Sequence, residues 1–149
     1  MFTILHISDG DKHFDSAITE YTKRLGKSVI LDALKPFKDS NRNLVIKKET
    51  EKLIERIKDK YANFQKVLLI KEGKDFTTEE FGEMIHGKDS IFVIGGPYGV
   101  DDQLFISAFP ETKKISFGKI TLPHGLAKLV LLEQIYRCGT IESGKTYHY

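Results

Sequence analysis

A length of 149 residues suits one domain, and a hydrophobic content of 40% is enough to bury a single core, so we expect one domain over residues 1–149. The 23 Lys and Arg residues nearly balance the 21 Asp and Glu residues, so the net charge of +2 gives little reason by itself to expect a polyanionic partner. The lone cysteine, Cys138, excludes an intrachain disulfide, and the absence of a signal-peptide pattern or a long apolar run predicts a cytoplasmic protein outside the membrane.

The first 90 residues alternate short apolar runs with amphipathic stretches. Three runs predict strands, at residues 2–7, 28–34 and 66–71. Two stretches with apolar residues at three- and four-residue spacing predict helices, at residues 14–25 and 44–61. Residues 72–74 predict a turn, and Thr77 with Glu80 matches a capping box before a third helix that stops at Gly87. Strands that alternate with helices predict an α/β domain, with a parallel sheet covered by helices on both faces.

The last third of the chain carries the most specific pattern. The apolar run at residues 91–94 breaks into GGPYG at residues 95–99, as a buried strand does when it delivers a tight loop to the edge of a sheet. Glycine there allows backbone amides to approach a ligand closely. A second apolar run at residues 115–117 ends in GKITLPH at residues 118–124, before a predicted helix at 126–137. The two strand ends therefore open toward loops that can share one ligand.

The composition of the same region predicts contacts beyond the single chain. Six Lys or Arg residues stand against two Glu residues between Lys113 and Tyr149, so basic charge gathers where the motifs are. The predicted helix at 126–137 is apolar on almost every side, which predicts burial all round. Packing against a second subunit, most simply in a twofold dimer, would complete that burial.

These motifs resemble those of the RlmH family of SPOUT methyltransferases, which methylate large-subunit ribosomal RNA. The resemblance rests on the loop IGGPYG, the turn TLPH, the helix end LLEQIYR and the terminal YHY, and it extends over nearly the whole chain. This chain ends in Tyr149 where the family usually has Lys or Arg, and it has Gly139 where the family often has a hydrophobic or aromatic residue nearby. The resemblance implies a SPOUT fold with a C-terminal trefoil knot, a knot and cofactor region at about 91–149, and a homodimer.

The resemblance also implies an activity: methylation of N3 of a pseudouridine in helix 69 of 23S ribosomal RNA, on assembled ribosomes, with S-adenosylmethionine as donor. In this family the donor is held mainly by backbone groups and apolar side chains. That role carries over to Leu69, Gly95, Phe117, Gly118, Lys119, Ile120, Thr121 and Leu122. Four further residues are candidates for the RNA side of the site: His124, Arg137, Tyr147 and His148. We expect no metal, because the five histidines show no metal-ligand spacing.

Each of these assignments has a simpler alternative. GGPYG matches neither a phosphate loop nor a dinucleotide fingerprint, so alone it would be an ordinary strand-to-helix turn. His124 follows a proline at a helix start and is either a hydrogen-bonded structural residue or a catalytic one. Arg137 either pairs with Glu133 or faces RNA, and the tail from Tyr147 either packs for stability or stacks on an exposed base. For the whole chain, the rival is a non-catalytic α/β module that binds a nucleotide or RNA.

Overall fold

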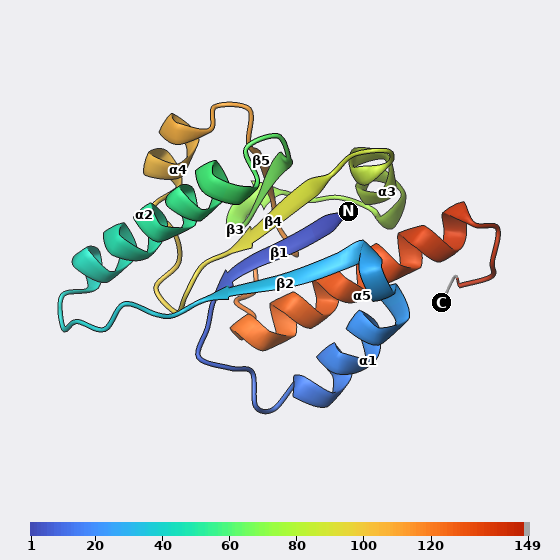
Figure 1. Cartoon of the computed structure of the whole chain (residues 1–149), viewed down its shortest axis with the longest axis horizontal. Helices are drawn as coiled ribbons and strands as arrows, with labels where there is room; N and C mark the ends of the chain where they lie inside the picture. Colours follow the sequence, from blue (N-terminus) through green and yellow to red (C-terminus); the bar gives the residue numbers. More distant parts are fainter. Residues whose placement is uncertain (148–149) are drawn as a thin grey trace.

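The computed structural model describes residues 1–147 and shows one five-stranded sheet between two layers of helices (Figure 1). The strands are β1 (Phe2–Ile7), β2 (Val29–Leu34), β3 (Gln65–Lys74), β4 (Ser90–Ile94) and β5 (Lys113–Ile115). The helices are α1 (Asp15–Leu25), the short 3-10 helix η1 (Gly26–Ser28), α2 (Arg42–Lys60), α3 (Thr78–Ile85), α4 (Asp102–Ala108) and α5 (His124–Glu142). The strand order is β2-β1-β4-β3-β5, and every neighbouring pair is parallel. The predicted α/β architecture is confirmed.

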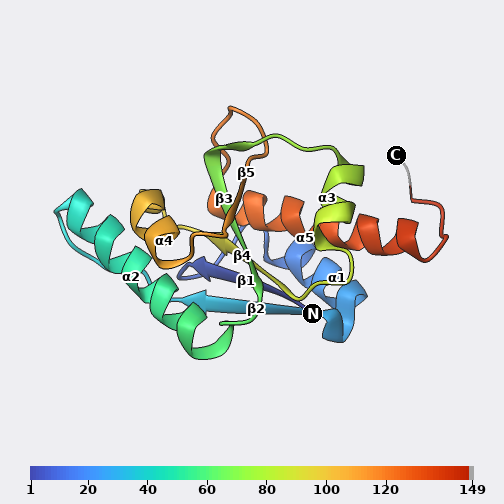
Figure 2. The same ribbon diagram turned by 90° about the horizontal axis from the view of Figure 1, so that it is seen from above.

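The two faces of the sheet bury two separate apolar clusters. Helices α1, α3 and α5 cover one face, where Ile18, Phe81 and Leu131 pack against strand residues. Helices α2 and α4 cover the other face. Figure 2, which views the molecule from above, shows these two helices together on one side. Consecutive residues of β1 divide between the clusters, Ile4 to the first and Leu5 to the second, because side chains alternate across a strand. Strands buried on both faces read as unbroken apolar runs, which is why the sequence located them.

Strand β3 is longer than the sequence predicts. Residues 72–74, expected to form a turn, continue the strand after a register shift, so that Lys74 pairs with Ile115 of β5. A Cβ atom added to Gly73 would lie 2.4 Å from the backbone carbonyl of Ile115, so only glycine permits this close approach of the two strands. Strand β5 in turn ends at Ile115, before the predicted limit at residue 117. The extended β3 therefore borders the loops that follow β4 and β5.

Two helices also differ from expectation. Helix α4 was not predicted, because seven residues are too few for a clear apolar period, although Asp101 caps it by accepting a hydrogen bond from the Leu104 amide at 3.0 Å. Helix α5 begins two residues earlier and ends five residues later than predicted. Within one chain α5 is not buried all round. Leu132 is fully buried in the core, while other apolar residues of α5 stay half-buried: Leu126, Leu129, Val130 and Tyr136.

No helix within residues 1–147 has the length and apolar character needed to cross a membrane. The predicted trefoil knot remains a prediction.

Candidate functional site

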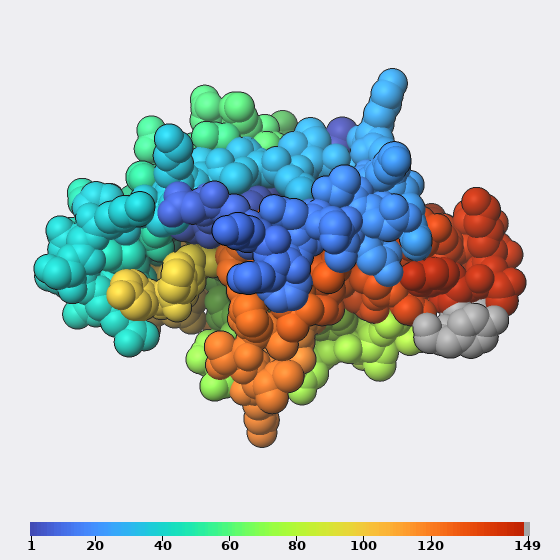
Figure 3. Space-filling view, turned by 90° about the horizontal axis from the view of Figure 1, so that it is seen from below, coloured from blue at the N-terminus to red at the C-terminus, as the bar shows by residue number. Residues whose placement is uncertain are grey.

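A cleft of about 880 Å³ opens at the edge of the sheet where β3, β4 and β5 end. Its walls are residues 69–72 of β3, the loop 94–100 after β4, and the segment 116–124 before α5. In Figure 3 the yellow loop and the orange segment flank this hollow. Because parallel strands carry their carboxyl ends to one edge, segments far apart in the sequence meet here.

The cleft collects the residues that the sequence assigned to a cofactor. Seven of the eight line its walls: Leu69, Gly95, Phe117, Gly118, Ile120, Thr121 and Leu122. Lys119 is exposed and is not among the lining residues. Their role in binding stays a prediction, but their convergence at one place does not depend on any ligand.

The glycines after β4 are required by the loop itself. A Cβ atom on Gly95 would lie 2.5 Å from Cγ2 of Val100 and 3.0 Å from the carbonyl carbon of Gly99, so a side chain would force the loop open. Gly99 adopts a φ of 83°, and its amide donates to the Gly96 carbonyl at 2.9 Å. The sequence explained these glycines by close approach to a ligand, whereas the structure shows that the loop needs them in order to fold back on itself.

Helix α2 supports this loop through two buried residues that sequence reasoning missed. The Thr50 hydroxyl accepts a hydrogen bond from the Asp101 amide at 3.0 Å. Glu49 is 1% exposed, and its Oε2 atom accepts from the Phe37 amide at 3.0 Å, while its Oε1 atom lies against Gly96 without a hydrogen-bond partner. Burial raises the pKa of the Glu49 carboxyl. The available signal was its position four residues from Leu53 on the apolar stripe of α2.

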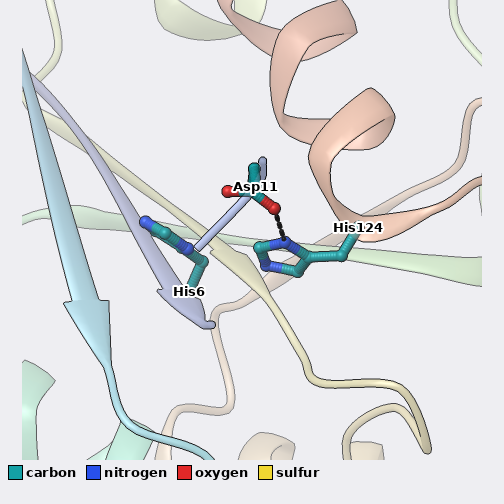
Figure 4. Close-up of side chains that lie close together, drawn as sticks. All are labelled: His6, Asp11 and His124. Carbon is teal, nitrogen blue, oxygen red and sulfur yellow. Dashed lines mark hydrogen bonds and ion pairs between the residues drawn. The ribbon is translucent and has the colours of Figure 1, made fainter. Parts of the chain in front are cut away.

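A buried polar cluster lies beneath the start of α5. Figure 4 shows His6, Asp11 and His124 close together, and Lys128 joins them through its contact with Asp11. The Nδ1 atom of His124 is 3.0 Å from Oδ1 of Asp11, and the Lys128 ammonium donates to Oδ2 of Asp11. The His6 and His124 rings are 5.2 Å apart between centroids. Gly125 makes this packing possible, because a Cβ atom there would lie 2.6 Å from the Phe14 ring and 3.0 Å from Oδ1 of Asp11.

The charges in the cluster are balanced internally. Burial alone would raise the pKa of Asp11, but hydrogen bonds from Lys128 and His124 outweigh it and hold that pKa below its usual value. Burial, with help from the nearby Lys128 ammonium, lowers the pKa of His6 to about 4, so His6 is neutral at pH 7. The Nε2 atom of His124 is buried and has no hydrogen-bond partner, so in this arrangement it does not face the open cleft. The structure therefore gives His124 a positioning contact at the start of α5.

The same cluster is the one place in residues 1–147 where metal-binding side chains gather. Ligand atoms of His6, Asp11 and His124 lie within 4.8 Å of one another. Sequence spacing did not reveal the group, because its members come from β1, the loop after β1 and α5. The Lys128 ammonium already neutralises Asp11, so a second cation there would meet repulsion from a buried charge. The expectation of no metal stays a prediction.

Comparison with known proteins places the chain in a family. Residues 2–148 match the family model described as Predicted SPOUT methyltransferase. The chain belongs to the SPOUT methyltransferases. It is also similar to proteins named Ribosomal RNA large subunit methyltransferase H: 35% identical to that of Mycoplasmopsis pulmonis over 97% of each chain, and 38% identical to that of Cytophaga hutchinsonii over 93% of this chain and 92% of the relative. The resemblance to the RlmH family is thereby confirmed.

One solved structure also shares the fold of this chain. The crystal structure of a "putative RNA methyltransferase" from Bacillus anthracis covers 100% of both chains with a TM-score of 0.56 at 14% sequence identity. At that identity the likeness shows the fold alone.

In this SPOUT methyltransferase the remaining RNA-side candidates lie away from the cleft. Arg137 pairs with Glu133, through Nε at 2.8 Å from Oε1, and its guanidinium lies 4.7 Å from the Tyr147 ring centroid. Tyr147 also packs edge-on against Tyr136 and lies 3.3 Å from the Tyr21 hydroxyl. Arg137 lies 13 residues after His124 on α5, which separates the two residues by roughly 20 Å along the helix. The structure therefore joins His124 to the cleft but not Arg137 or Tyr147, and His148 lies outside the described residues.

Proposed function

We propose that this methyltransferase transfers the methyl group of S-adenosylmethionine to N3 of a pseudouridine in helix 69 of 23S ribosomal RNA, on assembled ribosomes. The observation that carries the proposal is the convergence of seven predicted cofactor residues on one cleft at the carboxyl ends of parallel strands, where α/β folds bind ligands. The names of the related proteins, which act on large-subunit ribosomal RNA, support the substrate.

The lining of the cleft suits this donor. Its volume of about 880 Å³ falls in the range of roughly 300–1,000 Å³ that holds small ligands and cofactors. Glycine backbone and apolar side chains such as Leu69, Phe117 and Leu122 form most of the wall, which suits the faces of a purine ring. S-adenosylmethionine supplies a methyl group on a positively charged sulfonium, and the chain orients the acceptor nitrogen against it.

Removal of the N3 proton has few candidates on the cleft wall. Among the described lining residues, Glu72 carries a carboxylate and His124 an imidazole, which are side-chain types that act as general bases. The Nε2 atom of His124 is buried, whereas Glu72 is exposed. Orientation of the two reactants is therefore the main contribution of this chain, and the proton acceptor stays unassigned.

We infer further that the active form is a homodimer in which the tail of one chain completes the cleft of the other. Two observations support this inference. Half-buried apolar residues, among them Leu126 and Val130, remain on α5 within one chain. The tail and the cleft of the same chain also stand at opposite ends of that helix. Sedimentation at micromolar concentration tests the oligomeric state, and a monomer would contradict the inference.

The small net charge supports a ribosome, and not free RNA, as the substrate. A net charge of +2 provides few phosphate contacts, so the assembled ribosome would have to supply much of the binding geometry. Such a reaction takes place in the cytoplasm.

Methyl transfer to ribosomes that lack this modification is the direct test. We expect saturable binding of S-adenosylmethionine by calorimetry and one methyl group transferred per ribosome. A non-catalytic α/β module would bind RNA without saturable uptake of the donor, and that outcome would refute the proposal.

A further inference from the structure

Two large hydrophobic side chains are exposed at the mouth of the cleft. Within residues 1–147 the large hydrophobic side chains that are exposed are Met1, Ile30, Tyr98, Ile120 and Ile141. Two of these five line the same cleft: Tyr98, 45% exposed, on the loop after β4, and Ile120, 71% exposed, on the segment before α5. Exposed apolar residues that gather at one place mark a surface for a partner.

The Tyr98 ring is held in place by a cation. The Arg42 guanidinium, from the first turn of α2, lies 5.1 Å from the ring centroid of Tyr98, and both residues line the cleft. A guanidinium over an aromatic ring is attracted to its face. The loop that carries the ring is fixed by the Gly96–Gly99 hydrogen bond and by Thr50, which accepts from Asp101. Tyr98 is thus a braced aromatic ring with nearly half of its surface open to solvent.

An exposed ring beside a guanidinium matches the chemistry of an unpaired nucleotide. Aromatic side chains stack on exposed bases, and Arg binds the phosphates that flank them. The inner wall of the cleft is formed by half-buried residues such as Leu69, Gly95 and Phe117, whereas Tyr98 stands at the mouth, where the larger substrate arrives. Lys71 adds a second positive charge to the same wall.

We propose that Tyr98 is a stacking platform for an unpaired RNA base at or beside the methylated nucleotide, and that Arg42 braces the ring and contacts the neighbouring phosphate. This inference rests on the proposed function, because it assigns part of the RNA side of the same cleft. It adds a specificity-determining residue from the loop after β4 to the candidates that the sequence placed on α5 and the tail.

Three variants test the platform. Tyr98→Ala removes the ring, Tyr98→Phe keeps the stacking surface without the hydroxyl, and Ile30→Ala is the matched control, because Ile30 is similarly exposed but does not line the cleft. We expect Tyr98→Ala to lower kcat/KM for unmodified ribosomes by about tenfold to a hundredfold, which is the effect of losing one stacked base. Tyr98→Phe and Ile30→Ala should stay near the parent. The Kd for S-adenosylmethionine should change by less than about threefold in all three variants.

The outcomes separate this proposal from the proposed function. If Tyr98→Ala keeps the parent kcat/KM, or if its affinity for S-adenosylmethionine falls in parallel with kcat/KM, the platform is overturned, and in the second case the ring serves the donor. If the parent itself transfers no methyl group, the proposed function fails and co-sedimentation with ribosomes decides about Tyr98. Weaker ribosome binding by Tyr98→Ala alone would then keep the platform, and unchanged binding would overturn it.

Discussion

The two ends of helix α5 make different kinds of contact with the rest of the chain. At the cleft end, the helix starts on a buried polar cluster in which Asp11 joins His124 and Lys128. At the tail end, the contacts are aromatic and partly exposed, with Tyr147 packed on Tyr136 and on the Arg137 guanidinium. A buried, paired charge cluster tolerates little movement, because an unpaired charge there costs several kcal/mol, whereas a surface aromatic contact is readily exchanged. The contacts at the cleft end are therefore harder to rearrange than those at the tail end.

The candidate cofactor residues and two of the RNA-side candidates lie at different ends of α5. The cofactor candidates gather at the cleft end, while Arg137 lies roughly 20 Å along the helix from His124, and Tyr147 packs beside Arg137. One chain does not bring them together. A second chain, packed on the half-buried apolar residues of α5, is the simplest way to unite them.

Removal of the tail should produce the largest effect. Deletion of residues 147–149 is expected to lower ribosome methylation by more than about a hundredfold, while the affinity for S-adenosylmethionine stays within a factor of about ten, or roughly 1.4 kcal/mol. Rate and affinity are measured on one preparation. If the methylation rate and the donor affinity fall together, the tail covers the donor. If neither falls, the tail is not part of the site.

A substitution in the cleft loop should act on the donor first. Gly95→Val places a branched side chain where Val100 and Gly99 already lie, so the loop must open, and we expect the affinity for S-adenosylmethionine to fall by about tenfold to a hundredfold. Gly139→Val, at the tail end of α5 with no atom within 4 Å of its added Cβ, is the control and should bind the donor normally. Parent-like binding by a correctly folded Gly95→Val protein would mean that the donor site lies elsewhere.

Two glycines of α5 compare the packing of its ends directly. Gly125→Ala should lower the free energy of unfolding by about 1–3 kcal/mol, because the new methyl group would overlap Phe14 and crowd Asp11. Gly139→Ala meets open space in a helix and should raise the same free energy by about 0.5–1 kcal/mol. Urea unfolding measures both variants. Equal effects at the two positions would show that the cleft end is not the tighter one.

The buried histidine at the cleft end should make stability depend on pH. His6 has a pKa of about 4 in the folded chain against an ordinary value of 6.5, so the unfolded chain takes up its proton first as the pH falls. The contribution of His6 is therefore complete above pH 6.5 and is lost as the pH falls toward 4. Between pH 7.5 and pH 5 the parent should lose about 2 kcal/mol more stability than His6→Gln. Identical losses in the two proteins would rule out a buried, neutral His6.

The sequence predicted the sheet because its strands are buried on both faces and appear as unbroken apolar runs such as residues 91–94. Family motifs selected residues that line one cleft, and the fold explains why Leu69 and Phe117 both reach it, although their role in binding a cofactor stays a prediction. The charge cluster was hidden, because His6 and His124 are ordinary residues until β1 and α5 are placed side by side. The burial of Glu49 was hidden as well, because a glutamate in a helix is ordinarily exposed, and only its position on the apolar stripe of α2 indicated otherwise.

The most direct test asks whether a site is shared between two chains. The Gly95→Val protein and the chain that lacks residues 147–149 are given different tags and co-expressed. The mixed dimer is then purified through both tags. Such a dimer has one intact cleft facing one intact tail. At a donor concentration near the parent's Kd, where each variant alone has little activity, we predict about half of the parent's methylation of ribosomes. A mixed dimer with no more activity than either variant alone would show that each chain completes its own site. That result would contradict the division of the site between the two ends of α5.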